Sequence, residues 1–184
     1  MGASGVTAER GFNPPHLYAY LVTARTKLLD WVRPLSLEQY TREFPFGLKT
    51  LRDTLVEIPL AEWSYIRRMR EEPITLQSEE EHPFWRYYDT DFPPLEAAWR
   101  ELTDDTRRTL RAITDWSRPV EYTPVGGDRR VRIRTATGGI AAQLLFHEIH
   151  HRAQAMAMLR QLGIPAQDLD YSILAYERIP VPPG

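Results

Sequence analysis

The sequence predicts an all-α fold: a single four-helix bundle with a short β-hairpin between the third and fourth helices. Four long segments place apolar residues at the spacing of an amphipathic helix. Such helices bury their apolar stripes by packing against one another. The chain has 184 residues, a length that suits one domain. It contains no cysteine, which excludes disulfides and thiolate metal sites.

The first two helices are bounded by proline. The first predicted helix spans residues 14–33 and the second spans residues 50–70. Pro34 and Pro73 follow their ends, because a residue without a backbone N–H cannot continue a helix. Pro59 lies inside the second segment, so we expect that helix to kink or restart there.

The third predicted helix is followed by a change of period. It has Pro93 and Pro94 in its first turn, where proline is favoured, and its apolar stripe extends to Trp116. Apolar residues then alternate with polar ones in segments 120–122 and 130–134. The intervening Pro-Val-Gly-Gly-Asp supplies turn chemistry, so these segments predict a β-hairpin.

The fourth predicted helix spans residues 139–162, and Gly163 followed by Pro165 ends it. Residues 168–176 suit a short further helix that covers one end of the bundle. The connections before and after the third helix are both long. They argue against a strict up-down-up-down order, which uses short loops.

We expect a flexible N-terminal lead (1–13), one bundle domain (14–176) and a C-terminal tail (177–184). The net charge of −2 gives no electrostatic reason to expect nucleic-acid binding. No apolar run approaches the roughly 20 residues that cross a bilayer. The first residues lack the basic-then-apolar pattern of a signal peptide. These observations favour a cytoplasmic protein that binds neither nucleic acid nor membrane.

Two histidines of the fourth helix are the best candidates for metal ligands. His147 and His151 lie one helical turn apart, so their β-carbons are about 5–6 Å apart and both rings can reach one ion. Both occupy the apolar stripe, where a shared metal would satisfy one nitrogen of each buried ring. The alternative is a hydrogen-bonded core histidine. We interpret His150 first as a supporting or surface residue, with a further ligand as the alternative. His16 and His82 are interpreted as loop or helix-end residues.

Three stretches resemble the DinB-like family. Leu-Phe-His-Glu-Ile-His-His-Arg-Ala-Gln at 145–154 resembles its last-helix motif, with Ala153 in place of the usual glycine. Residues 51–63 resemble its second-helix segment, and residues 159–165 resemble its usual ending. The resemblance implies a four-helix bundle with an up-down-down-up path, often as a homodimer.

The resemblance also implies a divalent metal held by three histidines, one from the second helix and two from the fourth. The latter correspond to His147 and His151, whereas the second-helix position holds Glu57. The implied ligand set is therefore two imidazoles and one carboxylate, a set that binds zinc or iron(II). We expect zinc or nickel, with iron and manganese as alternatives. The other interpretation is a decayed site in which Glu57 is a solvated helix residue.

Glu62 is a rival third ligand because it interrupts the apolar stripe of the second helix. Its other interpretation is an ion pair with an arginine such as Arg152. Pro59 separates Glu62 from Glu57, so helical periodicity does not decide which glutamate faces the histidines. We expect Glu148 to be a surface or supporting residue, and Arg152 to pair with a carboxylate.

Three functions follow. The resemblance implies a metal-dependent thiol S-transferase or hydrolase that takes a low-molecular-weight thiol or another small substrate. The second is a stress-associated protein that binds metal without turnover. The third is a metal-free bundle that acts through an exposed helix face, an interpretation kept open by the glutamate at position 57.

Overall fold

The computed structural model describes residues 13–125 and 131–179. Four long helices form the bundle: α1 (Pro14–Val32), α3 (Leu51–Met69), α5 (Phe92–Ala112) and α6 (Thr137–Gln161). Short helices lie in the connections: α2 (Leu37–Thr41), α4 (Leu76–Glu80) and the 3-10 helix η1 (Trp85–Asp89). The predicted all-α bundle with a small hairpin is confirmed, and each predicted long helix is present.

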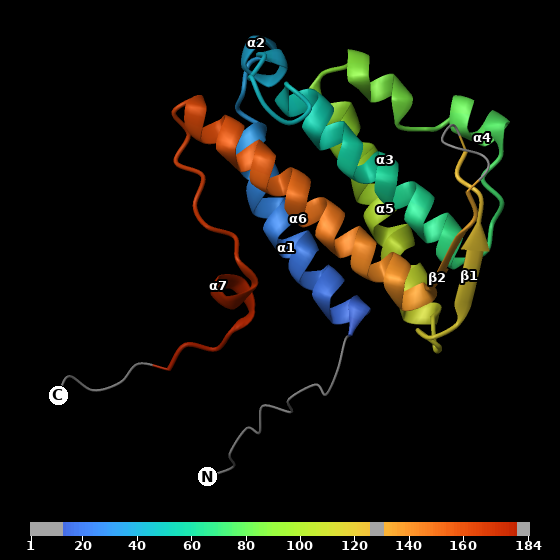
Figure 1. Ribbon diagram of the computed structural model, residues 1–184. Coiled ribbons are helices and arrows are strands. Elements are labelled where there is room, and N and C mark those ends of the chain that lie inside the picture. Colours follow the sequence, from blue (N-terminus) through green and yellow to red (C-terminus); the bar gives the residue numbers. More distant parts are fainter. Residues whose placement is uncertain (1–12, 126–130, 180–184) are drawn as a thin grey trace.

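The four helices run up, down, down and up in chain order (Figure 1). α3 packs against both α5 and α6, and α1 packs against the same two helices. The helices α3 and α6, which carry the three predicted ligands, are therefore neighbours across one side of the bundle. This order agrees with the path that the resemblance implied and with the long connections in the sequence.

The helix boundaries follow from capping chemistry. The Asn13 side chain accepts a hydrogen bond from the His16 backbone N–H, and the Thr50 side chain accepts one from that of Asp53. Such caps satisfy backbone donors that have no partner within the helix. α3 continues through Pro59 as one helix, so the expected restart does not occur.

The third helix is shorter than its apolar pattern predicted. α5 ends at Ala112, and Ile113 adopts an extended backbone conformation. Trp116 therefore packs against the core from a loop, where its carbonyl accepts a hydrogen bond from the Gly138 backbone N–H. The apolar spacing correctly indicated that this side chain contacts the core, where it is partly buried, but assigned it to the wrong element.

The predicted hairpin consists of β1 (Pro119–Tyr122) and β2 (Ile133–Ala136), which pair antiparallel with Tyr122 opposite Ile133. Val131 precedes the second strand. The predicted turn at Gly126–Gly127 and the strand residue Arg130 lie outside the described residues. The hairpin lies beside the C-terminal end of α3 and the start of α6 (Figure 1).

The last element is α7 (Tyr171–Ala175), which packs against α1. The Tyr20 hydroxyl donates to the Leu169 carbonyl at 2.8 Å, which fixes the approach of this segment. The predicted short C-terminal helix is thus present, and it lies along the side of α1 (Figure 1). Within the described parts of the chain, no helix is both long and apolar enough to cross a membrane.

Candidate metal centre

Glu57, His147 and His151 converge at the interface of α3 and α6. Each offers a ligand atom, and these three atoms lie within 4.8 Å of one another. His147 Nε2 lies 3.6 Å from Glu57 Oε1. Ligand bonds of about 2.0–2.2 Å to one ion place its donors roughly 3–4 Å apart, so small side-chain adjustments would let all three reach it. The donor set of two nitrogens and one carboxylate oxygen fits a divalent ion of the zinc type.

Helix geometry brings the two imidazoles together. His147 and His151 lie one turn apart on α6, and their ring centroids are 4.5 Å apart. Glu57 reaches them from α3, which packs against α6 along its length. The side chains of Glu57 and His147 are 29% and 16% exposed, so the cluster is accessible from solvent. An ion bound there would keep positions open for water or a substrate.

Neighbouring side chains orient the cluster. His151 Nδ1 and Gln154 Oε1 lie 3.1 Å apart, so Nδ1–H donates to the amide oxygen and Nε2 is left as the nitrogen that could bind a metal. The amide group of Gln154 in turn donates to His150 Nε2 at 3.0 Å. The hydroxyl of Tyr88, in η1, donates a hydrogen bond to Glu57 Oε2 at 3.3 Å. His150 therefore supports the cluster through Gln154, as the sequence indicated, and is not a member of it.

The pKa shifts of Glu57 and His151 are compatible with metal binding. Burial alone would raise the pKa of Glu57, but its contact with His147 outweighs burial and the pKa is lowered. Burial lowers the pKa of His151, and the neighbouring His147 lowers it further. Near neutral pH the carboxylate is thus ionised and the His151 ring is neutral. These are the forms that bind a cation.

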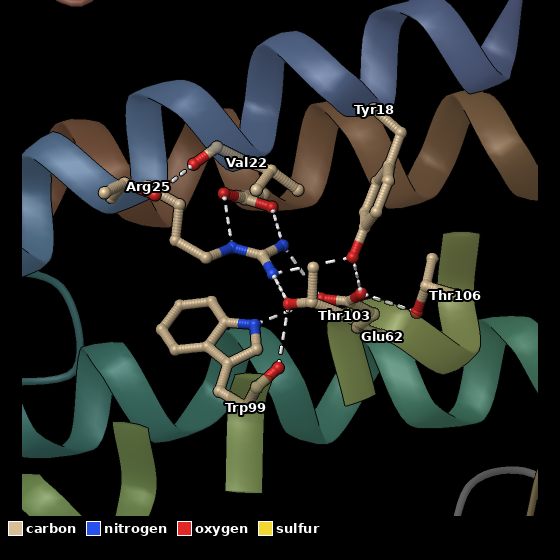
Figure 2. Close-up of polar contacts among 9 residues, drawn as sticks. Tyr18, Val22, Arg25, Glu62, Trp99, Thr103 and Thr106 are labelled. Atoms are coloured by element: carbon tan, nitrogen blue, oxygen red, sulfur yellow. Dashed lines mark hydrogen bonds and ion pairs between the residues drawn. The ribbon is translucent and has the colours of Figure 1, made fainter. Parts of the chain in front are cut away.

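Glu62 does not join the cluster. It points into the core between α1, α3 and α5, where Arg25 donates to it at 2.9 Å (Figure 2). The Tyr18 hydroxyl and the Thr106 hydroxyl both donate to Glu62 Oε1, and Trp99 Nε1 donates to Oε2 at 3.2 Å. Every lone pair of this carboxylate has a partner, which removes Glu62 as a metal ligand. Its ion-pair interpretation is correct, but the partner is Arg25 and not Arg152.

Arg25 also holds Glu148. Its Nε and Nη2 donate to the two oxygens of Glu148 at 3.1 and 2.5 Å, a bidentate pair. Glu148 is 2% exposed, so the expected surface position is wrong. Burial raises the pKa of Glu148, and the positive charge of Arg25 opposes this rise. Arg25 itself is 4% exposed and lies over the Trp99 ring at 4.5 Å.

The remaining predictions concern single residues. Arg152 donates to the Tyr20 hydroxyl at 2.6 Å, in place of the expected carboxylate. His16 lies in the first turn of α1, and His82 lies in the connection between α4 and η1. Arg25 was not among the candidate residues that the sequence analysis named. Arg25 adjoins the buried Ala24, and this position at the edge of the apolar stripe was the available signal.

Comparison with known proteins places these observations in a family. A family model described as the DinB family matches residues 5–180, which is nearly the whole chain. A search of curated proteins gave no match.

Proposed function

The chain belongs to the DinB family, and from this membership we propose that it binds a divalent metal ion through Glu57, His147 and His151. The observation that carries the proposal is the convergence of one carboxylate and two imidazoles from adjacent helices, with ligand atoms within 4.8 Å of one another. Zinc and nickel are the metals we propose first, and iron and manganese are the alternatives.

We propose further that the site performs metal-dependent thiol transfer or hydrolysis. A bound divalent ion supplies Lewis acidity and lowers the pKa of a thiol or water next to it. Tyr88 would orient the Glu57 carboxylate through its hydroxyl hydrogen bond. Tyr65 meets the His147 ring edge-on, with centroids 5.8 Å apart, and would restrict its rotation. Glu148 is held by Arg25 in the core, so it is not available as a general base.

Metal analysis of purified variants tests the first proposal. His147→Ala and His151→Ala should each lose most of the bound metal, because each removes one of three ligands. Glu57→Ala should weaken binding to a smaller extent, because water can take the place of a carboxylate oxygen. His16→Ala and Glu101→Ala are matched controls outside the cluster. Wild-type metal content in both histidine variants would refute the proposed site.

A turnover screen tests the second proposal. The protein is stripped with a chelator, reloaded separately with zinc, nickel, iron or manganese, and assayed with several low-molecular-weight thiols and electrophilic acceptors. We expect turnover by one reloaded form and none by the stripped form. Stoichiometric metal without turnover would favour the non-catalytic metal-binding alternative, which the engagement of Glu148 by Arg25 also favours. A protein that binds no metal would favour the metal-free interaction module.

A further inference from the structure

A hollow of about 370 Å³ lies between the C-terminal half of α3, the hairpin and the first turns of α6. Its lining includes Tyr65 and Arg68 of α3, Tyr122 of β1, Thr135 of β2 and Gln143 of α6. The structure describes all the residues that line this hollow, and Arg68 is the only charged residue among them. The hollow therefore has a net positive charge and several neutral hydrogen-bonding groups.

The hollow adjoins the candidate metal centre through Tyr65. This ring meets His147 edge-on on one side, and its hydroxyl accepts a hydrogen bond from Gln143 Nε2 at 3.4 Å on the other. Gln143 precedes His147 by one turn of α6, and Glu57 and Arg68 belong to the same helix α3. At about 1.5 Å per residue, Glu57 and Arg68 are roughly 16 Å apart along that helix. A small molecule in an extended conformation can span this distance.

Arg68 has no ion-pair partner within the part of the chain that the structure describes. Its guanidinium carbon lies 4.3 Å from the centroid of the Tyr122 ring. The acidic residues of the neighbouring surface are paired with other arginines: Glu71 with Arg118, Glu72 with Arg67 and Arg70, and Glu121 with Arg132 and Arg134. Arg68 therefore differs from these neighbouring arginines, each of which is paired with a carboxylate.

An unpaired guanidinium over an aromatic ring suits an oxyanion. Stacking uses the face of the group and leaves the N–H donors at its edge available. These donors form a planar fork that matches a carboxylate or phosphate with two parallel hydrogen bonds. Arg68 and Tyr122 are both partly buried, so solvent screens such a pair less than it would on an open surface.

We propose that this hollow binds the oxyanion group, a carboxylate or a phosphate, of the small molecule whose reactive end meets the metal centre. Arg68 supplies the charge, Tyr122 packs against the guanidinium, and Gln143 and Thr135 supply neutral hydrogen bonds. The oxyanion site stands on the hollow and on Arg68 alone. Its link to a reacting molecule rests on the proposed function.

Nuclear magnetic resonance of the isotope-labelled, metal-stripped full chain tests the oxyanion site. Acetate and inorganic phosphate are titrated separately, and the side-chain N–H signals of Arg68 and Gln143 are followed. We expect saturable shifts with at least one of the two, which also distinguishes a carboxylate from a phosphate. Arg68→Met should weaken binding at least about tenfold, because a charge-assisted bidentate contact is lost. Arg68→Lys keeps the charge without the fork and should bind with intermediate affinity.

Arg107→Met is the matched control, because Arg107 lies on α5 and pairs with Asp104 outside the hollow. It should bind both anions as the wild type does. Wild-type affinity in the Arg68→Met variant, or the absence of any saturable shift in the wild type, would overturn the oxyanion site.

A second measurement tests the link to the metal. Cobalt-loaded protein is titrated with ω-mercapto fatty acids of increasing chain length and with the matching ω-mercapto alcohols, and thiolate-to-cobalt absorption is recorded. We expect one chain length at which the acid binds at least about tenfold more tightly than the alcohol, and loss of this preference in Arg68→Met. Equal binding at every length would overturn the link. Failure of cobalt to bind, with phosphate or acetate binding intact, would refute the proposed function and leave the oxyanion site supported.

Discussion

At the scale of single residues, Gln154 determines which nitrogen of His151 is free. Its amide oxygen takes the Nδ1 proton, so that Nε2 is directed to the cluster. Gly47 packs against the same amide: a β-carbon there would lie 3.0 Å from Gln154 Oε1, and the glycine has a φ of 58°. A side chain at position 47 would be strained and would also press on the amide. The loop before α3 therefore contributes to the orientation of His151 without supplying a ligand.

Gln154→Ala should weaken metal binding about 10–100-fold, the usual effect of removing a residue that orients a metal-binding histidine. Thermal stability should change little, because the Gln154 side chain is only partly buried. Competition with a chromophoric chelator measures the affinity, and Gln161→Ala at the exposed end of α6 is the control. An affinity equal to that of the wild type would show that His151 needs no such support.

The sequence alone was sufficient to predict the site residues whose proximity follows from helix geometry. The spacing of His147 and His151 on one helix fixes their proximity, and the structure brings them together. The position of Glu57 came from the family motif. Contacts made by residues distant in the sequence, such as Tyr88 with Glu57, could not be predicted because they depend on how η1 lies over α3.

At the scale of elements, α1 carries none of the proposed ligands, but it connects the two helices that carry them. Arg25 of α1 pairs with Glu62 of α3 and with Glu148 of α6. Glu148 directly follows His147 in the chain, and all three charged residues are almost fully buried. A guanidinium that holds both carboxylates in place limits how far α3 and α6 can slide past each other.

Arg25→Met should destabilise the fold by about 3–5 kcal/mol, because it leaves two carboxylates buried without their cation. Arg33→Met on the same helix is the control, since Arg33 is 45% exposed and exposed pairs contribute at most about 1 kcal/mol. Urea unfolding measures both. A loss in Arg25→Met no larger than that in Arg33→Met would contradict this role.

The sequence predicted the presence and type of the long helices well, because a stripe of apolar residues at helical spacing is a local signal. Their ends were less predictable. Trp116 belonged to the apolar pattern of the third helix but packs from a loop. The burial of Arg25 was missed because it requires knowledge of which helices surround α1, and periodicity within one helix does not contain that information.

At the scale of the whole molecule, the long connection between α3 and α5 is anchored by His82. This histidine is 3% exposed and packs on Trp63. Its Nε2–H donates to the Leu60 carbonyl at 3.1 Å, and its Nδ1 accepts from the Phe84 backbone N–H at 3.2 Å. The second contact needs the neutral ring, because a protonated Nδ1 cannot accept a hydrogen bond, whereas the first is made by either form of the ring. Burial lowers the pKa of His82 to about 4.

The free energy of unfolding should therefore fall as the pH falls from about 6.5 to about 4. In that window the unfolded chain binds a proton at His82 and the folded chain does not, so acid favours the unfolded state. The loss from this residue should reach at most about 3 kcal/mol. Urea unfolding at several pH values measures it, and His82→Gln should show a smaller dependence on pH. Parallel pH curves for the two proteins would contradict the assignment.

The buried Arg25 network restricts which combinations of residues homologous chains can carry. Loss of the arginine alone would leave both acids uncompensated in the core, so positions 25, 62 and 148 should be inherited together. Among homologous chains, a replacement of the arginine should coincide with neutral residues at one or both acidic positions. Homologues that keep both acids and lack any cation at the first position would show that the three vary freely.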